Sequence, residues 1–186
     1  MSTDEAHSKT VTIENRLGFH VRPVQRFSEL ARAFEGDVKV EIGGKEADGK
    51  SVMGLMSLGA KSGSEMTITT QGIDARQALD LLSFLASNRF FVEDRMDDDN
   101  PEERHIERLV KFSSCFDSDI EAEIEGERVD ASDPEALRQV GLEPTSPVKF
   151  HIEGEDQKQA SEVLEKLVDY RFYVEEAMGA ESKNKG

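Results

Sequence analysis

Apolar and polar residues alternate over three short stretches in the first half of the chain, residues 11–14, 38–42 and 66–69. Alternation with a period of two is typical of strands that bury one face. The Gly43-Gly44 pair follows the second stretch and predicts a tight turn into a further short strand. The first half is therefore expected to contain four strands.

Between these stretches, apolar residues recur at spacings of three and four, which indicates helices with one buried side. Pro23 fits only the first turn of a helix, whereas Ser51 and Asp74 are favoured N-caps. Three helices are expected to begin at these residues. Strands and helices in this order predict an α+β fold, an antiparallel four-stranded sheet with three helices on one face.

The chain contains an internal repeat, and this repeat decides its organisation. Residues 34–94, moved forward by 82 positions, lie on residues 116–176 without a gap. The shared positions are mostly glycines and apolar residues, which fix turns and cores. Examples are Gly44 and Gly126, Gly72 and Gly154, and Leu82 and Leu164. The two halves are therefore expected to share a fold.

The second half departs from the first at its beginning. Residues 95–101 form a mostly polar, acidic segment that ends in the pair Asn100-Pro101, so no counterpart of the first strand is expected there. We expect a first domain over residues 1–94 and an acidic linker over 95–100. A degenerate copy without the first strand is expected over 101–178, and a disordered tail over 179–186.

Charge narrows the class of protein. The net charge of −16 argues against nucleic-acid binding, because phosphate neutralisation requires a basic surface. Residues 1–94 hold 14 acidic and 11 basic side chains, a net of −3, whereas the remainder holds 25 and 12, a net of −13. This difference suggests that the two halves have different tasks.

The sequence predicts no membrane insertion, signal peptide or internal disulfide. No apolar run approaches the roughly 20 residues that cross a bilayer, and the first residues lack the basic and apolar regions of a signal peptide. Cys115 is the single cysteine and is expected to be a small buried core residue. No metal-ligand cluster or glycine-rich nucleotide loop is found, so neither metal nor cofactor is expected. These observations predict a cytoplasmic protein.

The sequence Gly18-Phe19-His20-Val21-Arg22-Pro23 places a histidine and an arginine where a helix is expected to begin. Helix N-termini carry unpaired N–H groups and partial positive charge, which suits a phosphoryl group. A histidine there can carry phosphate as a phosphoramidate, and the guanidinium of Arg22 matches phosphate geometry. We therefore predict that His20 is the catalytic residue and that Arg22 assists it.

Ser51 is a second candidate, because a hydroxyl stands where another helix is expected to begin. Serine is a common N-cap, and capping alone would explain it. A phosphate at this hydroxyl would add roughly two negative charges beside an apolar surface and weaken a partner that docks there. Ser51 is therefore a candidate site of regulatory phosphorylation. The apolar surface is expected to comprise Val52, Met53, Leu55 and Met56.

On these motifs, residues 9–93 resemble the HPr phosphocarrier of the bacterial phosphoenolpyruvate:sugar phosphotransferase system. Residues 18–23 resemble its active-site histidine motif, and residues 44–59 resemble its regulatory serine motif. The resemblance implies an HPr-like open-faced sandwich in which His20 takes phosphate from phosphorylated enzyme I and passes it to a IIA-type acceptor. It also implies a dedicated serine kinase/phosphorylase that acts on Ser51.

Two residues near His20 depart from the family pattern. The family usually has an aliphatic residue at the position of Phe19 and a small residue at that of Val24. Because both adjoin the histidine, the docking partners are expected to differ from those of a sugar-transport HPr. We include Phe19 and Pro23 among the expected partner-binding residues.

The second half lacks the histidine motif. His105 lies three residues out of register with His20 and is expected on a helix surface. The position that matches Ser51 is Asp133, which together with Pro134 forms a standard helix start; a permanent phosphoserine mimic is the alternative interpretation. We predict that this half cannot carry phosphate.

Loss of the first strand would leave a strand edge of the second half unpaired, and open edges attract partners. Residues 90–93, a second copy of the chain or a foreign strand could pair there, so a homodimer through the second half is one hypothesis. The leading prediction for the whole chain is a phosphoryl carrier rather than a self-contained enzyme. The alternative is a regulatory binding module whose partner choice depends on its phosphorylation state, with little sugar-transport flux.

Overall fold

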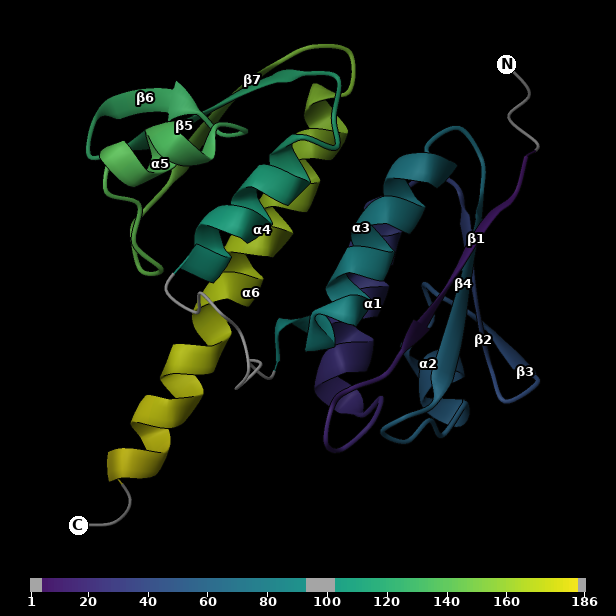
Figure 1. Cartoon of the computed structure of the whole chain (residues 1–186). Helices are drawn as coiled ribbons and strands as arrows, with labels where there is room; N and C mark the ends of the chain where they lie inside the picture. The colour runs from purple at the N-terminus through teal and green to yellow at the C-terminus, as the bar shows by residue number, and fades with distance from the viewer. Residues whose placement is uncertain (1–4, 93–102, 184–186) are drawn as a thin grey trace. The chain divides into compact units, whose positions relative to one another are not determined.

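The structure, a computed structural model, describes the backbone of residues 5–92 and 103–183 and the side chains of residues 5–92 and 103–170. The chain forms two compact units, Met1–Arg95 and Met96–Gly186 (Figure 1). None of the described helices combines the length and the apolar character that crossing a bilayer requires.

The first unit alternates strands and helices in the order expected from its sequence. Its strands are β1 (His7–Thr12), β2 (Asp37–Ile42), β3 (Lys45–Asp48) and β4 (Glu65–Gln71). Its helices are α1 (Val21–Arg32), α2 (Val52–Ser57), α3 (Ala75–Ser87) and the short 3-10 turn η1 (Arg89–Phe91). The strands form one antiparallel sheet in the order β1-β4-β2-β3, and the helices pack on one face of it (Figure 1). The expected α+β fold is confirmed.

Strand β1 begins at His7, earlier than the apolar alternation indicated, because its polar residues pair with β4. The hydroxyls of Ser8 and Thr69 lie 2.8 Å apart, and those of Thr10 and Thr67 are at the same distance. Such cross-strand hydroxyl pairs stabilise a solvated sheet face. Hydroxyl pairing therefore extends the strand where burial does not.

Asp74 occupies the N-cap position of α3, but its side chain does not cap the helix. The carboxylate instead accepts the backbone N–H groups of Glu35 and Gly36, at 2.7 and 2.9 Å. Asp74 therefore joins the start of α3 to the turn between α1 and β2. The expected capping bond is corrected to this longer-range contact.

The second unit repeats this order. Its elements are α4 (Arg104–Ser113), β5 (Asp119–Ile124), β6 (Glu127–Asp130), α5 (Pro134–Gln139), β7 (Lys149–Glu153) and α6 (Gln157–Lys183). Strands β5 and β6 and helix α5 have the bounds of β2, β3 and α2 displaced by 82 residues. The described strands form a three-stranded sheet in the order β6-β5-β7, which confirms a degenerate copy of the first fold.

The sequence made specific predictions for the linker, for the end of the last helix and for Cys115. The linker over residues 95–100 lies outside the described residues. Helix α6 runs as far as Lys183, through the first residues of the tail expected from residue 179, where Ala180, Glu181 and Lys183 are helix formers. The domain bounds themselves stay a prediction. Cys115 is half-buried rather than buried.

The contact made by Asp74 is repeated by Asp156. Its carboxylate accepts the N–H groups of Asp117 and Ser118, at 2.9 and 3.0 Å, and also the Ser118 hydroxyl. Burial raises the pKa of Asp156, but these hydrogen bonds outweigh burial and hold the pKa below its ordinary value. Both units thus use one carboxylate to join the same two loops.

Candidate functional site

The loop before α1 is fixed by close backbone packing. Gly18 has a φ of +69°, and a Cβ on it would lie 2.4 Å from the carbonyl oxygen of Ala60. The N–H of Phe19 donates to that same oxygen at 3.1 Å. Only glycine fits this position, because any side chain would clash with the backbone of the 60–61 loop. The loop that carries the histidine is therefore held against the end of α2.

His20 lies at the N-cap of α1, half-buried, with an extended backbone. Its side chain makes no capping hydrogen bond, and its carbonyl accepts the Val24 N–H at 3.0 Å. Pro23 has no N–H group. In the described structure, the first-turn amides that a ligand can reach are therefore those of Val21 and Arg22. The Arg22 side chain is exposed. The imidazole, two amides and a guanidinium thus belong to a single helix start.

An aromatic cluster lies behind the histidine. The ring of Phe19 stacks on that of Phe90 at a centroid distance of 5.1 Å and meets the edge of Phe27 at 6.1 Å. Phe19 is 4% exposed, and Pro23 is also buried. Their expected contact with partners is therefore corrected, since both are directed into the core. Two apolar residues near the histidine that the sequence did not single out, Leu17 and Val21, are instead 66% and 51% exposed.

A left-handed turn supports this cluster from the end of α3. Arg89, Phe90 and Phe91 have φ values of 52°, 57° and 56°, which side-chain-bearing residues seldom adopt. The buried Arg26 guanidinium donates to the carbonyls of Phe90 and Phe91, and the buried Asn15 amide donates to that of Arg89 at 2.9 Å. These donors stabilise the carbonyls of the turn, which holds Phe90 beneath Phe19.

Ser51 is the N-cap of α2, as expected. Its hydroxyl oxygen accepts the Gly54 N–H at 3.0 Å. The neighbouring Lys50 ammonium donates to the Phe34 carbonyl at 2.7 Å, and the Lys50 carbonyl accepts the Arg32 guanidinium at 2.9 Å. Ser51 therefore lies beside the C-terminal half of α1, whereas the loop after α2 contacts the start of α1.

Helix α2 exposes part of the apolar surface that was expected. Met53 is 83% exposed and Met56 is 40% exposed, while Val52 is half-buried. Leu55 is fully buried, so its expected partner-binding role is corrected, because it faces the core on the other side of the helix. We call the exposed set the apolar face, and it consists of Leu17, Val21, Met53 and Met56.

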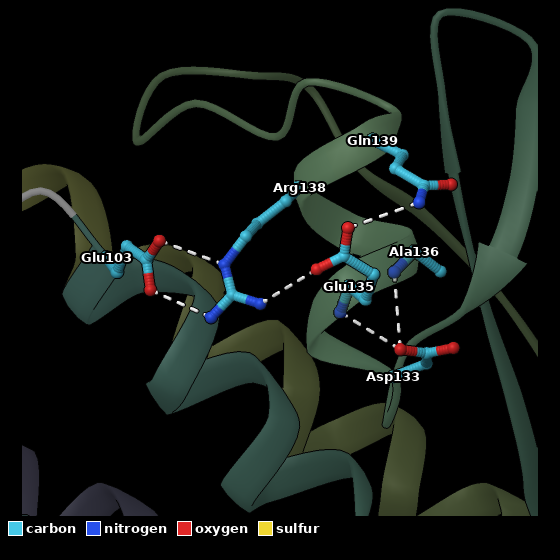
Figure 2. Close-up of polar contacts among 6 residues, drawn as sticks. All are labelled: Glu103, Asp133, Glu135, Ala136, Arg138 and Gln139. Carbon is cyan, nitrogen blue, oxygen red and sulfur yellow. Dashed lines mark hydrogen bonds and ion pairs between the residues drawn. The ribbon is translucent and has the colours of Figure 1, made fainter.

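The second unit has ion pairs at the positions that match Val21, Met53 and Met56, which are Glu103, Glu135 and Arg138 (Figure 2). Arg138, which matches Met56, donates to both carboxylate oxygens of Glu103, with N–O distances of 2.9 and 2.8 Å. It also lies 3.4 Å from Glu135, which matches Met53. The hydrogen bond from Arg138 and its positive charge lower the pKa of Glu103. The second unit therefore presents a charged surface at these positions.

The matched helix start in the second unit is capped by Asp133. One carboxylate oxygen accepts the N–H groups of Glu135 and Ala136, at 2.9 and 3.2 Å, and Pro134 occupies the first turn (Figure 2). The expected helix start is confirmed. The interpretation of Asp133 as a phosphoserine mimic stays a hypothesis.

His105 is buried, which corrects the expectation that it lies on a helix surface. It occupies the position of Pro23, whose side chain is also directed inward. Its Nε2 lies 2.7 Å from the carbonyl oxygen of Leu142, which matches the Ala60 oxygen of the first unit. The residue that matches the donor Phe19 is Pro101, which has no N–H. The imidazole therefore contacts a carbonyl that a backbone amide satisfies in the first unit.

Comparisons with known proteins support the fold and the repeat. A family model described as "PTS HPr component phosphorylation site" matches residues 7–88 and 101–169, which is most of the chain. The chain belongs to the HPr family. The two matches correspond to the two units, so it carries HPr domains in tandem.

Individual relatives match one HPr domain. The phosphocarrier protein HPr of Cupriavidus necator is 42% identical over 82 residues, covering 44% of this chain and 92% of the relative. The HPr-like protein Crh of Bacillus subtilis is 40% identical over 73 residues, covering 39% and 86%. The crystal structure of HPr from Bacillus anthracis has 38% identity and a TM-score of 0.42, and covers 44% of this chain and 96% of that one.

Proposed function

We propose that His20 accepts a phosphoryl group from phosphorylated enzyme I and passes it to a IIA-type acceptor in the cytoplasm. Membership of the HPr family supports this assignment most directly. The position of His20 supports it further, because its side chain makes no capping bond and stands at a helix start with amides available. The reaction is phosphoryl transfer through a carrier.

In the first transfer, an unprotonated imidazole nitrogen of His20 attacks the phosphorus. The P–N bond forms as the bond from phosphorus to the donor breaks, and the second transfer reverses these roles. The Val21 and Arg22 amides and the Arg22 guanidinium are suited to bind the phosphoryl oxygens, since charge-assisted donors favour the transferred group. Pro23 removes one donor from this turn and fixes its backbone.

The apolar face is the surface that we assign to the phosphotransfer partners. Its four residues flank the helix start that carries His20 or lie on α2, which packs against α1. Exposed methionines are adaptable contacts and suit a surface that binds more than one partner in turn. Enzyme I and the IIA-type acceptor would then use the same face at different times.

Ser51 is the proposed regulatory position, as the substrate of a dedicated serine kinase/phosphorylase. A phosphate there would lie at the N-terminus of α2, where Met53 and Met56 are exposed. It would place roughly two negative charges beside apolar contacts and weaken docking. Ser51→Asp should keep the helix cap, as Asp133 does, and lower the transfer rate. If Ser51→Ala had the same transfer rate as Ser51→Asp, a role for the negative charge would be contradicted.

Intact-mass measurement with site mapping tests the carrier assignment. The protein is mixed with enzyme I, magnesium and phosphoenolpyruvate, and a single acid-labile phosphoryl group is expected on His20. His20→Ala should abolish labelling, while His151→Ala in the second unit should label normally. Arg22→Ala should label more slowly without loss of fold. Wild-type labelling of His20→Ala, or no labelling of the wild type beside a labelled control HPr, would overturn the proposal. The second of these results would favour a regulatory binding module.

A further inference from the structure

Strand β7 has an edge without a partner strand among the described residues. In the first unit, the matching strand β4 lies between β1 and β2, whereas in the described part of the second unit β7 pairs with β5 alone. Displacement of β1 by 82 residues gives residues 89–94. Of these, Phe90 and Phe91 are fully buried in the first unit, and Arg26 donates to their carbonyls. The described residues of this segment, 89–92, therefore belong to the first unit.

The register identifies the backbone groups on the open edge. The carbonyl of Ile120 accepts the Ala131 N–H, so Ile120 directs its backbone toward β6. Backbone polar groups of successive strand residues point to alternate edges. The neighbours of Ile120 on β5 therefore bond to β7, where Glu121 is paired with His151. It follows that Phe150 and Ile152 direct their N–H and C=O groups away from β5.

A groove runs along this edge. Phe150 and Ile152 are half-buried, whereas Ile68 and Thr70, which match them, are 0% and 1% exposed. In the first unit β1 packs against α3 in this place. In the second unit Phe150 and Ile152 line a groove of about 440 Å³ with four residues of α6, Gln157, Lys158, Ser161 and Glu162. The groove thus combines apolar side chains with strand backbone that has no partner strand among the residues the structure describes.

We infer that β7 pairs with β7 of a second copy, antiparallel and centred on His151. This register places Phe150 opposite Ile152 of the partner subunit, so the outward backbone groups of each strand bond to those of the other. It also places Lys149 opposite Glu153 of the partner subunit. Opposite charges on directly facing strand residues stabilise an antiparallel pair. The sequence Lys149-Phe150-His151-Ile152-Glu153 is therefore complementary to itself in this arrangement.

The outer face of the sheet is compatible with this register. His151 would face its counterpart across the two-fold axis, but its Nε2 lies 2.6 Å from Glu123 of its own sheet. Each imidazole therefore has a carboxylate partner within its own subunit. Residues 93–102 fit the edge less well, because Asp97-Asp98-Asp99 has low strand propensity. A second copy supplies better strand residues and matched charges.

Sedimentation velocity of the full chain, at about 5 to 200 µM, tests the inference. A dimer of twice the 20.7 kDa chain mass is expected to form as concentration rises. Ile152→Pro should abolish it, because it removes an outward N–H at an edge position where proline is tolerated. Tyrosine fluorescence and circular dichroism report whether each variant remains folded.

Charge exchange provides the matched control. Lys149→Glu and Glu153→Lys should each weaken the dimer about tenfold, because each makes both facing pairs like-charged. The double variant Lys149→Glu/Glu153→Lys should restore the dimer, which a purely structural role of either residue would not produce. Backbone amides of residues 150 and 152 should become protected from hydrogen exchange as concentration rises.

Three results would overturn the inference. A wild type that stays monomeric with protected β7 amides would mean that another part of the chain occupies the edge. A monomer with unprotected amides would leave the edge to a foreign strand. A dimer that persists in Ile152→Pro, or that the double charge exchange does not restore, would place the interface elsewhere.

Discussion

Matched positions of one fold carry surfaces of opposite character in the two units. The first unit exposes the apolar residues Val21, Met53 and Met56. The second unit has the ion-paired residues Glu103, Glu135 and Arg138 at these positions. Because the side chains at these positions are exposed or half-buried in both units, either set is compatible with the fold. The difference therefore concerns what the surface binds.

The framework beneath these surfaces is the same in both units. Ser51 and Asp133 cap the same short helix, and Asp74 and Asp156 join the same two loops. Contacts that fix backbone geometry were retained, while the apolar contacts and the histidine motif were not. The second unit therefore has an HPr fold without the apolar face that we assign to the phosphotransfer partners.

The largest expected effect comes from transferring the second unit's surface to the first. Val21→Glu/Met53→Glu/Met56→Arg should reduce the rate of transfer from phosphorylated enzyme I on the order of a thousandfold, since three apolar contacts are lost and charges are desolvated. The fold should be unaffected, because all three positions are exposed. The rate of phosphohistidine formation at low protein concentration measures the effect.

Ile73→Glu is the matched control for this variant. Ile73 is 77% exposed and lies just after the C-terminal end of β4. The opposite, N-terminal end of β4 is the one beside the histidine loop. It should transfer at the wild-type rate. A triple variant within twofold of the wild type would show that the apolar face does not bind the donor.

The last helices of the two units differ in where they end. Both halves contain Arg-Phe, at 89–90 and 171–172, yet α3 ends at Ser87 and turns left-handed, whereas α6 continues. The turn in the first unit depends on Asn15, whose amide donates to the Arg89 carbonyl. The residue that matches Asn15 is Asp97, and a carboxylate has no proton to donate.

Asn15→Asp should therefore destabilise the first unit by about 3 kcal/mol, because a buried carboxylate would face a carbonyl. Hydrogen exchange of peptides from residues 7–92, with and without urea, measures the loss. Both tyrosines, Tyr170 and Tyr173, belong to the second half, so tyrosine fluorescence should show its transition unchanged. Unchanged exchange in the first unit would exclude Asn15 as the support of the turn.

Much of the fold could be predicted from the sequence, because periodicity and turn residues act locally. The Gly43-Gly44 turn, the Ser51 cap and the 82-residue repeat are examples. The start of β1 could not be predicted, since it depends on hydroxyl pairs with a strand 57 or more residues away. Neither could the bond partners of Asp74, which are set by the turn between α1 and β2.

The places of the candidate residues in the fold were predictable, but the exposure of their neighbours was not. His20, Arg22 and Ser51 stand at helix starts, as the motifs indicated. Phe19 and Leu55 were assigned to a surface and are buried, because burial depends on which side of the backbone meets the core. His105 stands four and seven residues before Leu109 and Phe112, and this helical spacing was the signal that could have indicated its burial.

The two loop-joining carboxylates, Asp74 and Asp156, should each contribute to the unfolding free energy of their own unit only. Asp156→Asn should cost the second unit about 2 kcal/mol at neutral pH, because bonds to a charged acceptor are lost. Since the folded pKa of Asp156 is lowered, its contribution is present above the ordinary value near 3.9 and is lost as pH falls through the folded pKa. The gap between wild type and variant should therefore shrink below about pH 4.

Urea titrations followed by tyrosine fluorescence measure this gap, because the signal comes from the second half alone. Asp74→Asn, the matched change in the first unit, should leave that transition in place. A gap for Asp156→Asn that is constant from pH 7 to pH 3 would contradict the assigned role of the carboxylate.

The smallest effect is expected from Arg138→Met, which gives the second unit the residue that the first unit has at the matching position, Met56. The ion pairs of Arg138 are solvent-accessible, so their loss should lower the urea midpoint of the second unit only slightly. The difference from wild type should decrease with added salt, because screening weakens the pairs that only the wild type has. It should also decrease as acid protonates Glu103, whose pKa Arg138 lowers. A difference that persists in high salt would mean that Arg138 acts through packing of its aliphatic stem, and the contrast between the two surfaces would then be partly structural.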